Sequence, residues 1–343
     1  MIFSWSYSRS CHMANSSEYN EASVRVYHGY GHMHNLIIFG HVLTKKLKTR
    51  HNYTNNVFSN AMYLFRLFLV RPLAAAHVQL QWRSQLLDSR TEADGFYKFE
   101  WKSDTEVEAG WHKVVIKFLD ISGNVAATGE GKIFVPHSTQ YGFISDVDDT
   151  VLISHSFTIG KRLRVLFGNN PRTRKAFTDV VRYYELLAGS HTTPEIPNPF
   201  FYVSSSEWNL YDDLNDFFDH NGLPKGIFLL NQIKRWSQLL KTGKTKHEGK
   251  LLRVARILDA FPKQKFILLG DNSQSDPSIY SSIASKYPDR IFAVYIRNVF
   301  AKNESETKEI LGRLVKLGVF TCFFKNNYDA IQHSKAIGLI VGP

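Results

Sequence analysis

The sequence predicts an α/β protein in which a doubly wound parallel sheet is preceded by a small β-sandwich domain with one helix. From Tyr141 onward, short apolar runs alternate with helical stretches, as in sheets whose parallel strands are joined by helices. Before that point, apolar residues alternate with polar ones between turn sequences, which is typical of half-buried strands. With 343 residues, 43% of them hydrophobic, the chain can bury two cores. We therefore expect a disordered start at 1–20, a β-sandwich-like domain at 21–138 and a second domain at 139–343.

The front domain carries signals for several strands and one helix. Asn35 to Leu43 is an apolar run of strand length, and residues 55–70 place apolar side chains at helical spacing. Gly29-Tyr30-Gly31 lacks the third glycine of a dinucleotide site and is interpreted as a turn. His28, His32 and His34 lack a cysteine or an acid pair nearby, so they are interpreted as loop histidines rather than a metal site. Further strands are predicted near 78–82, 97–101, 114–119 and 132–135.

The second domain contains five apolar runs that we interpret as parallel strands. They span 141–145, 200–204, 226–230, 266–270 and 291–296. Sheets of this kind bind ligands at the carboxyl ends of their strands, so the residues just after each run are the first candidates for chemistry.

Two acids, Asp146 and Asp148, follow the first of these runs at a spacing of two residues. One carboxylate can attack phosphorus while the other protonates the leaving oxygen, which is what covalent phosphoryl transfer requires. A calcium-binding loop is excluded because Val151 and Phe157 occupy the positions where such a loop needs glycine and a bidentate acid. An acidic turn remains the alternative for this motif taken alone.

Two later strand ends carry polar clusters as well. Ser204-Ser205-Ser206 can hold a phosphate oxygen through hydroxyl and backbone N–H groups. Serines at a strand end are more often N-caps of a helix, here one predicted at 207–218, and the two roles can coexist. Asp271 and Asp276 follow the run at 266–270 and supply the hard oxygen ligands that suit Mg²⁺. Four acids in two clusters would repel one another, and a divalent ion would hold them together.

A cation that reaches the same phosphate is expected, and Lys250 is the best placed candidate, at the start of a predicted helix spanning 250–261. A solvated helix lysine is the alternative for Lys250 taken alone, because most lysines lie at the surface. Lys244 and Lys246 are rival candidates.

Composition restricts the partners and the compartment. A formal charge of +11 favours anionic partners without choosing among phosphoesters, acidic lipid surfaces and nucleic acid. Cys11 and Cys322 form neither a disulfide framework nor a thiolate metal site, so a cytoplasmic setting is expected. The most apolar stretch, 62–76, is interrupted by charges and proline and falls short of a membrane span, and no secretory signal is recognised at the start.

Taken in order, these motifs resemble those of the haloacid dehalogenase superfamily: an Asp-x-Asp-x-Thr sequence, a serine, a lysine and a Gly-Asp-x-x-x-x-Asp sequence. More narrowly, the segments 142–150, 201–208 and 266–271, with Asp276-Pro277 and Ile279-Tyr280, resemble the actin-patch-associated phosphatidate phosphatase family. The core of that family was long catalogued as a domain of unknown function. Tyr27 to Gly31 and the turn at 94–97 also look like features of its front domain.

The resemblance implies a Mg²⁺-dependent phosphatidate phosphatase that works through an aspartyl-phosphate. It implies Asp146 as nucleophile and Asp148 as general acid and then base, and a haloacid dehalogenase-like fold for 139–343. Phosphate is expected to contact Thr150, Ser204, Ser205 and Lys250, and Mg²⁺ is expected to bind Asp146, the main chain of Asp148, Asp271 and Asp276.

Alternatives to this reaction remain open at the level of the sequence. One is a soluble phosphatase or phosphotransferase acting on a small phosphomonoester or a phosphoprotein, and another is a non-catalytic binding module on the same scaffold. Peripheral contact with an anionic membrane is a further expectation, because six basic residues lie between the first two motifs, whereas no nucleic-acid partner is expected. Those residues are Lys161, Arg162, Arg164, Arg172, Arg174 and Lys175.

Overall fold

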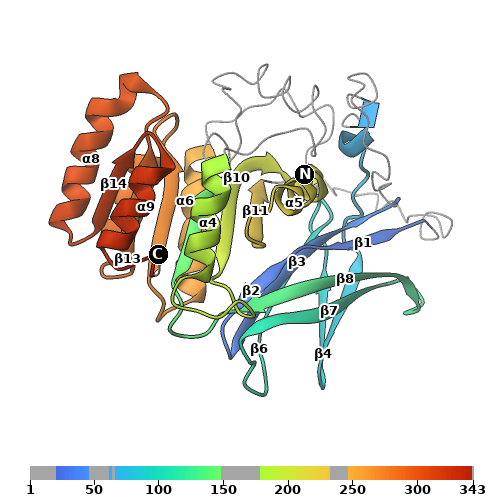
Figure 1. The fold of residues 1–343 in the computed structure, drawn as a ribbon. Coiled ribbons are helices and arrows are strands. Elements are labelled where there is room, and N and C mark those ends of the chain that lie inside the picture. The colour runs from blue at the N-terminus through green and yellow to red at the C-terminus, as the bar shows by residue number, and fades with distance from the viewer. Residues whose placement is uncertain (1–20, 46–61, 64–65, 148–177, 232–245, 342–343) are drawn as a thin grey trace, which may run out of the picture.

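The computed structural model describes residues 21–45, 62–63, 66–147, 178–231 and 246–341 of the chain. Two β-sheets, here called sheet A and sheet B, lie beside each other, and helices accompany sheet B (Figure 1). The expected start at 1–20 and most of the helix predicted at 55–70 lie outside the described residues, although 62–63 and 66–68 are helical. None of the described helices is long and apolar enough to cross a membrane.

Sheet A contains eight strands in mixed orientation, hydrogen-bonded in the order β1-β3-β2-β8-β7-β4-β5, with β6 on the other side of β3. The pairing of β2 with β8 is parallel, and the other pairings are antiparallel. The strands are β1 (Ser23–Val26), β2 (Gly29–Gly31), β3 (Asn35–Leu43), β4 (His77–Trp82), β5 (Gln85–Arg90), β6 (Phe96–Lys102), β7 (Gly110–Leu119) and β8 (Val125–Val135).

Alternate residues of these strands bury one face of sheet A around a common core. Leu36 of β3, Leu80 of β4, Phe99 of β6 and Ile116 of β7 all belong to it, so the sheet folds over its own inner face. Strands from different parts of the sheet thus enclose one core, as the sandwich prediction expects, but hydrogen bonds join all eight into a single sheet.

The interpretation of Gly29-Tyr30-Gly31 as a turn was wrong, because these residues form strand β2. A Cβ on Gly29 would lie 2.2 Å from the carbonyl oxygen of Ile37, and one on Gly31 would lie 2.2 Å from that of Asn35. Both glycines therefore serve a close approach to β3 rather than a reversal of the chain. The predicted strand at 35–43 is confirmed as β3.

Sheet B is parallel throughout, with the order β11-β10-β9-β12-β13-β14. All five predicted strands are present, and β14 is an additional edge strand. The strands are β9 (Gly142–Asp146), β10 (Phe200–Glu207), β11 (Ile227–Asn231), β12 (Phe266–Asp271), β13 (Ile291–Arg297) and β14 (Phe320–Phe324). The chain is therefore α/β, with a mixed sheet followed by a parallel one.

Helices connect the strands of sheet B and pack in groups. Helix α4 contacts α9, while α7 contacts both α6 and α8. In Figure 1, α4 and α9 lie in front of the sheet and α6 lies behind it. In the described part of this region, the α-helices are α4 (Thr178–Gly189), α5 (Tyr211–His220), α6 (Lys246–Ala260), α7 (Asp276–Lys286), α8 (Glu304–Lys316) and α9 (Asn327–Ala336), and the 3₁₀ turns are η1 (Trp208–Leu210) and η3 (Ala301–Asn303).

Aromatic side chains join the two sheets along a continuous apolar seam. The ring of Tyr27 stacks on that of Trp208, with centroids 4.1 Å apart and planes 13° apart. The ring of Tyr30 meets Phe201 edge to face at 5.6 Å. The Tyr211 hydroxyl accepts a hydrogen bond of 3.0 Å from the backbone N–H of His28. Because the aromatic residues of this seam are buried, the core of sheet B includes side chains of the front part of the chain.

Candidate active site

Asp146 lies at the carboxyl end of β9, the strand that has β10 on one side and β12 on the other. Every residue of β9 is buried, and Asp146 is only 2% exposed. The register pairs Val203 of β10 with Asp146, and Leu269 of β12 with Ser145. The polar residues that follow β10 and β12 are therefore adjacent to Asp146, as the parallel arrangement predicts.

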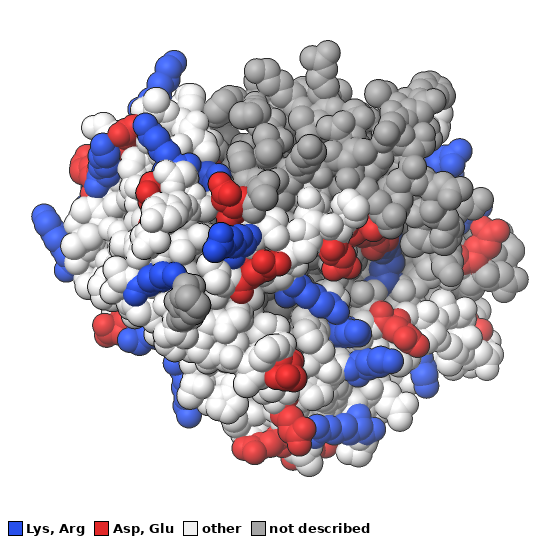
Figure 2. Space-filling view, viewed as in Figure 1, with Lys and Arg blue, Asp and Glu red and all other residues white. Residues whose placement is uncertain are grey.

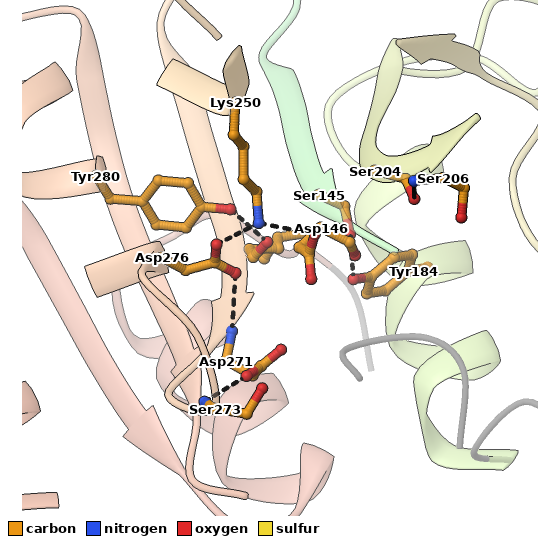
Figure 3. A network of polar contacts seen from close by, with 11 residues as sticks. Ser145, Asp146, Tyr184, Ser204, Ser206, Lys250, Asp271, Ser273, Asp276 and Tyr280 are labelled. Atoms are coloured by element: carbon orange, nitrogen blue, oxygen red, sulfur yellow. Dashed lines mark hydrogen bonds and ion pairs between the residues drawn. The ribbon is translucent and has the colours of Figure 1, made fainter. Parts of the chain in front are cut away.

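Lys250 joins two of the predicted acids (Figure 3). From the first turns of α6, its Nζ donates a hydrogen bond of 2.7 Å to Oδ1 of Asp146 and another to Oδ1 of Asp276. Burial would lower the pKa of Lys250, but the two carboxylates outweigh burial and the net effect is a raised pKa. The surface alternative for Lys250 is thus wrong, because the residue is 6% exposed and forms two buried ion pairs. Its rival Lys244 lies outside the described residues, as does the side chain of Lys246.

A third buried acid, Asp271, completes a cluster of carboxylates. One oxygen each from Asp146, Asp271 and Asp276 lies within 4.8 Å of the others. Burial first, and then the charge of Asp276, raise the pKa of Asp271 to about 6, although a hydrogen bond of 2.6 Å from the backbone N–H of Ser273 opposes the shift. Three acids with one lysine leave an excess of negative charge, and hard oxygen ligands in this number suit Mg²⁺.

Gly270 allows Asp276 to approach the end of β12. A Cβ at this position would lie 2.5 Å from Oδ2 of Asp276 and 2.9 Å from the ring of Tyr280. The Tyr280 hydroxyl donates a hydrogen bond of 2.9 Å to the carbonyl of Leu269 and so fixes the ring against this strand. The glycine of the Gly-Asp sequence is therefore required by packing, because any side chain would displace a carboxylate of the cluster.

Two polar residues beside Asp146 were not among the predicted site residues. The Ser145 hydroxyl donates to the main-chain carbonyl of Asp146 at 2.8 Å and shares a hydrogen bond of 2.7 Å with the hydroxyl of Tyr184 in α4. All three residues are buried. These bonds hold the backbone of Asp146 from the side opposite Lys250 (Figure 3). Tyr184 lies 39 residues from Ser145, so only the folded chain reveals this contact.

Ser204 and Ser206 lie on the other side of Asp146 from Lys250 (Figure 3). Strand β10 continues through the serines to Glu207, with an irregular register between Val203 and Glu207. The Ser204 hydroxyl accepts a hydrogen bond of 3.0 Å from the backbone N–H of Ser206. The capping alternative is not supported, since residues 207 and 210 precede η1 and α5 and neither forms a side-chain cap. The helix predicted from residue 207 begins as η1 at Trp208, and α5 starts at Tyr211.

Asp148 and Thr150 lie outside the described residues, as do the six basic residues between the first two motifs. The predicted loop histidines behave as structural groups. His28 Nδ1 lies 3.0 Å from the carbonyl oxygen of Gly226, and His32 Nδ1 accepts a hydrogen bond of 3.2 Å from the backbone N–H of His34.

Residues 141–298 match the family described as phosphatidate phosphatase APP1, catalytic domain. The chain is 31% identical over 179 residues to phosphatidate phosphatase APP1 of Saccharomyces cerevisiae, covering 50% of this chain and 29% of that protein. It is 26% identical over 169 residues to an uncharacterized protein of Schizosaccharomyces pombe, covering 46% of this chain and 25% of that protein. The resemblance to the phosphatidate phosphatase family expected from the motifs is confirmed, and the chain spans less than a third of either relative.

Likeness to solved structures is weak. A carbohydrate acetylesterase from Xanthomonas citri aligns with a TM-score of 0.30 and 7% identity, covering 88% of this chain and 66% of that one. An FMN-binding beta-glucuronidase from Facaelibacterium prausnitzii L2-6 aligns with a TM-score of 0.31 and 7% identity, covering 93% and 56%. Neither alignment indicates a shared fold or a shared function.

Proposed function

Because residues 141–298 match the catalytic domain of phosphatidate phosphatase APP1, we propose that this chain is a Mg²⁺-dependent phosphatidate phosphatase that yields diacylglycerol and phosphate. The observation that carries the proposal is the buried contact of Lys250 with Asp146 and Asp276 at the ends of the central strands. We further propose that residues 139–343 form a doubly wound fold of the haloacid dehalogenase type. Parallel pairing throughout sheet B supports this assignment.

In the proposed reaction, a carboxylate oxygen of Asp146 attacks phosphorus and the bond to the leaving glycerol oxygen breaks. The ion pair with Lys250 favours the ionised, nucleophilic form of Asp146. Asp148 gives its proton to the leaving oxygen and then removes a proton from the water that hydrolyses the aspartyl-phosphate. The main-chain contact from Ser145 keeps the Asp146 carboxylate oriented toward the phosphate.

The remaining residues bind the phosphoryl group and balance its charge. Lys250 can turn from Asp276 to a phosphate oxygen, since both are anionic partners. Thr150, Ser204 and Ser205 are proposed to donate further hydrogen bonds to the phosphate. Mg²⁺, held by Asp146, the Asp148 main chain, Asp271 and Asp276, would neutralise the charge that develops on the phosphoryl oxygens.

The lipid substrate rests on the relative from Saccharomyces cerevisiae, which is named a phosphatidate phosphatase. A cytoplasmic enzyme that meets this substrate would contact an anionic membrane peripherally, and the charge of +11 supports such contact. The catalytic cluster itself would serve any phosphomonoester, so the alternative is a phosphatase acting on a small soluble ester.

Phosphate release from phosphatidate in mixed micelles tests the proposal, measured with Mg²⁺ and with EDTA for the native chain and for Asp146→Asn. We expect release that requires Mg²⁺ and is abolished in the variant. Turnover of a soluble phosphomonoester without turnover of phosphatidate would retain the mechanism and reject the lipid substrate. Absence of both activities would favour a binding module.

A further inference from the structure

A cavity of about 370 Å³ lies between the β7–β8 hairpin of sheet A and the segment that leads into β11. We call it the lysine pocket, because Lys113, Lys132 and Lys225 line it from three different segments of the chain. The remaining lining residues are Val26, His28, Glu130, Gly131, Tyr211 and Asn215. In Figure 2, Lys and Arg side chains lie over the region of β7 and β8 on the face shown, interspersed with acidic ones.

Two of these lysines occupy an unfavourable position in the sheet. Lys113 of β7 and Lys132 of β8 are direct partners in the antiparallel register. Like charges directly opposite each other on neighbouring strands destabilise a sheet. Within the described part of the chain, Lys113, Lys132 and Lys225 form no salt bridge. A pair of residues that destabilises the sheet locally is expected at functional sites, such as a site that binds an anion.

Lys225 brings the third positive charge from the segment that leads into β11 of sheet B. Its Nζ lies 4.7 Å from the ring centroid of Trp111, a cation–π contact that helps hold the ammonium group in place. Desolvation, and then the charge of Lys132, lower the pKa of Lys225, while Asp219 opposes this shift. His28, another residue that lines the pocket, donates a hydrogen bond from Nδ1 to the carbonyl of Gly226. Burial lowers the pKa of His28 to about 4. His28 is therefore neutral near neutral pH, and the positive charge of the pocket comes from the lysines.

We propose that the lysine pocket binds a phosphate-bearing anion at a second, non-catalytic site. A phosphate placed among the three ammonium groups would offset their mutual repulsion, and lysine binds phosphate as a point charge. The volume falls within the range of ligand sites and admits a phosphate with a small organic part. Glu130 is the acidic residue of the lining; it reduces the net positive charge of the pocket but forms no ion pair with any of the three lysines.

The lysine pocket and the candidate active site lie at opposite ends of sheet B. Gly226 immediately precedes β11, whereas Asp146 is the last residue of β9. Because β9, β10 and β11 are parallel, the pocket is at the amino ends of the strands and Asp146 at their carboxyl ends. One phosphate group cannot occupy both sites, so a ligand of the pocket is distinct from a substrate held at Asp146.

The test uses the full chain in EDTA, where the carboxylates of Asp146, Asp271 and Asp276 repel an anion from the candidate active site; binding by the lysine pocket is the part that is lost when its lysines are removed. Binding of inorganic phosphate is measured by calorimetry, and binding of phosphatidylcholine vesicles with and without phosphatidate by sedimentation, both at one ionic strength. The test variant is Lys132→Gln/Lys225→Gln. The matched control is Lys102→Gln/Lys117→Gln, which removes the same charge from β6 and β7 outside the pocket.

We expect the native chain and the control to bind alike and the pocket variant to bind at least about tenfold more weakly. Binding of inorganic phosphate with this pattern identifies a free phosphate compound as the source of the ligand. The same pattern for phosphatidate vesicles alone identifies a lipid headgroup. Equal losses in the two double variants, or no binding in either assay, would overturn the proposal. Because no turnover is measured, failure here is independent of failure of the proposed reaction.

Discussion

Replacing Lys250 by methionine should destabilise the metal-free protein by about 3–5 kcal/mol near neutral pH, the cost of breaking a buried ion pair from one side. The ammonium group contacts Asp146 and Asp276, whose side chains are 2% and 0% exposed. Methionine has a similar volume and leaves no large cavity, so the loss isolates the charge. The two freed carboxylates would remain buried beside Asp271, the third acid of the cluster.

Urea unfolding in EDTA, followed by circular dichroism, measures this loss. Lys308→Met is the matched control, because Lys308 also forms an ion pair of 2.7 Å, with Glu304, but its side chain is 62% exposed. Such a surface pair contributes less than about 1 kcal/mol. Mg²⁺ should stabilise the Lys250 variant more than the native chain, since the ion binds a cluster without its internal cation. Equal unfolding midpoints for the Lys250 variant and the native chain in EDTA would refute the reasoning.

Three further predictions concern the same cluster. In EDTA, Asp271 should contribute an unfolding free energy that grows as pH falls through about 6 toward 4, because its raised pKa makes the folded state take up a proton before the unfolded state does; the buried His28 and His41, whose lowered pKa values act in the opposite direction, are common to both chains, so pH-dependent urea titrations should show this contribution as the difference between the native chain and Asp271→Asn. Gly270→Ala should cost about 1–3 kcal/mol and weaken Mg²⁺ binding measured by calorimetry, because its Cβ would lie 2.5 Å from Oδ2 of Asp276, whereas Gly312→Ala, with open space around its Cβ, should be neutral or slightly stabilising. Tyr184→Phe should cost about 1 kcal/mol in urea unfolding and lower the turnover number more than it changes the Michaelis constant; an unchanged turnover number would argue against positioning of the nucleophile.

The strands were predictable wherever burial imposes a pattern on the sequence. β3 and the five predicted strands of sheet B are apolar runs because both of their faces are buried, and β4 and β6 alternate because one face is exposed. β5 was not predicted because its burial alternates only between intermediate and exposed, which leaves little hydrophobic pattern to detect. β2 was misinterpreted because two glycines in three residues suggest a turn, whereas here they serve a close approach to β3.

The sequence predicts which site residues lie at the ends of strands, but it does not predict the contacts between segments that are far apart in the chain. Asp146 and Asp271 follow apolar runs, so their positions at the end of the sheet could be inferred from local sequence. The choice of Lys250 over its neighbours depends on the rotational position of α6 relative to a strand 104 residues earlier, which no local pattern encodes. Tyr184 was missed for the same reason, since one tyrosine in an amphipathic helix resembles any other core residue.

The hydrophobic core of sheet B includes residues from the front part of the chain, which lies outside the segment that matches the family. The matched segment, 141–298, contains every described residue of the proposed catalytic cluster, and 138 was predicted as the boundary of the front domain. Yet Trp208, which follows the serines of β10, stacks on Tyr27, and Phe201 in the same strand packs against Tyr30. Removing the front strands would expose these aromatic faces beside the strand that carries Ser204, so the catalytic segment depends on sheet A for the packing that fixes β10. The front domain is thus part of the site's scaffold as well as the place of the lysine pocket.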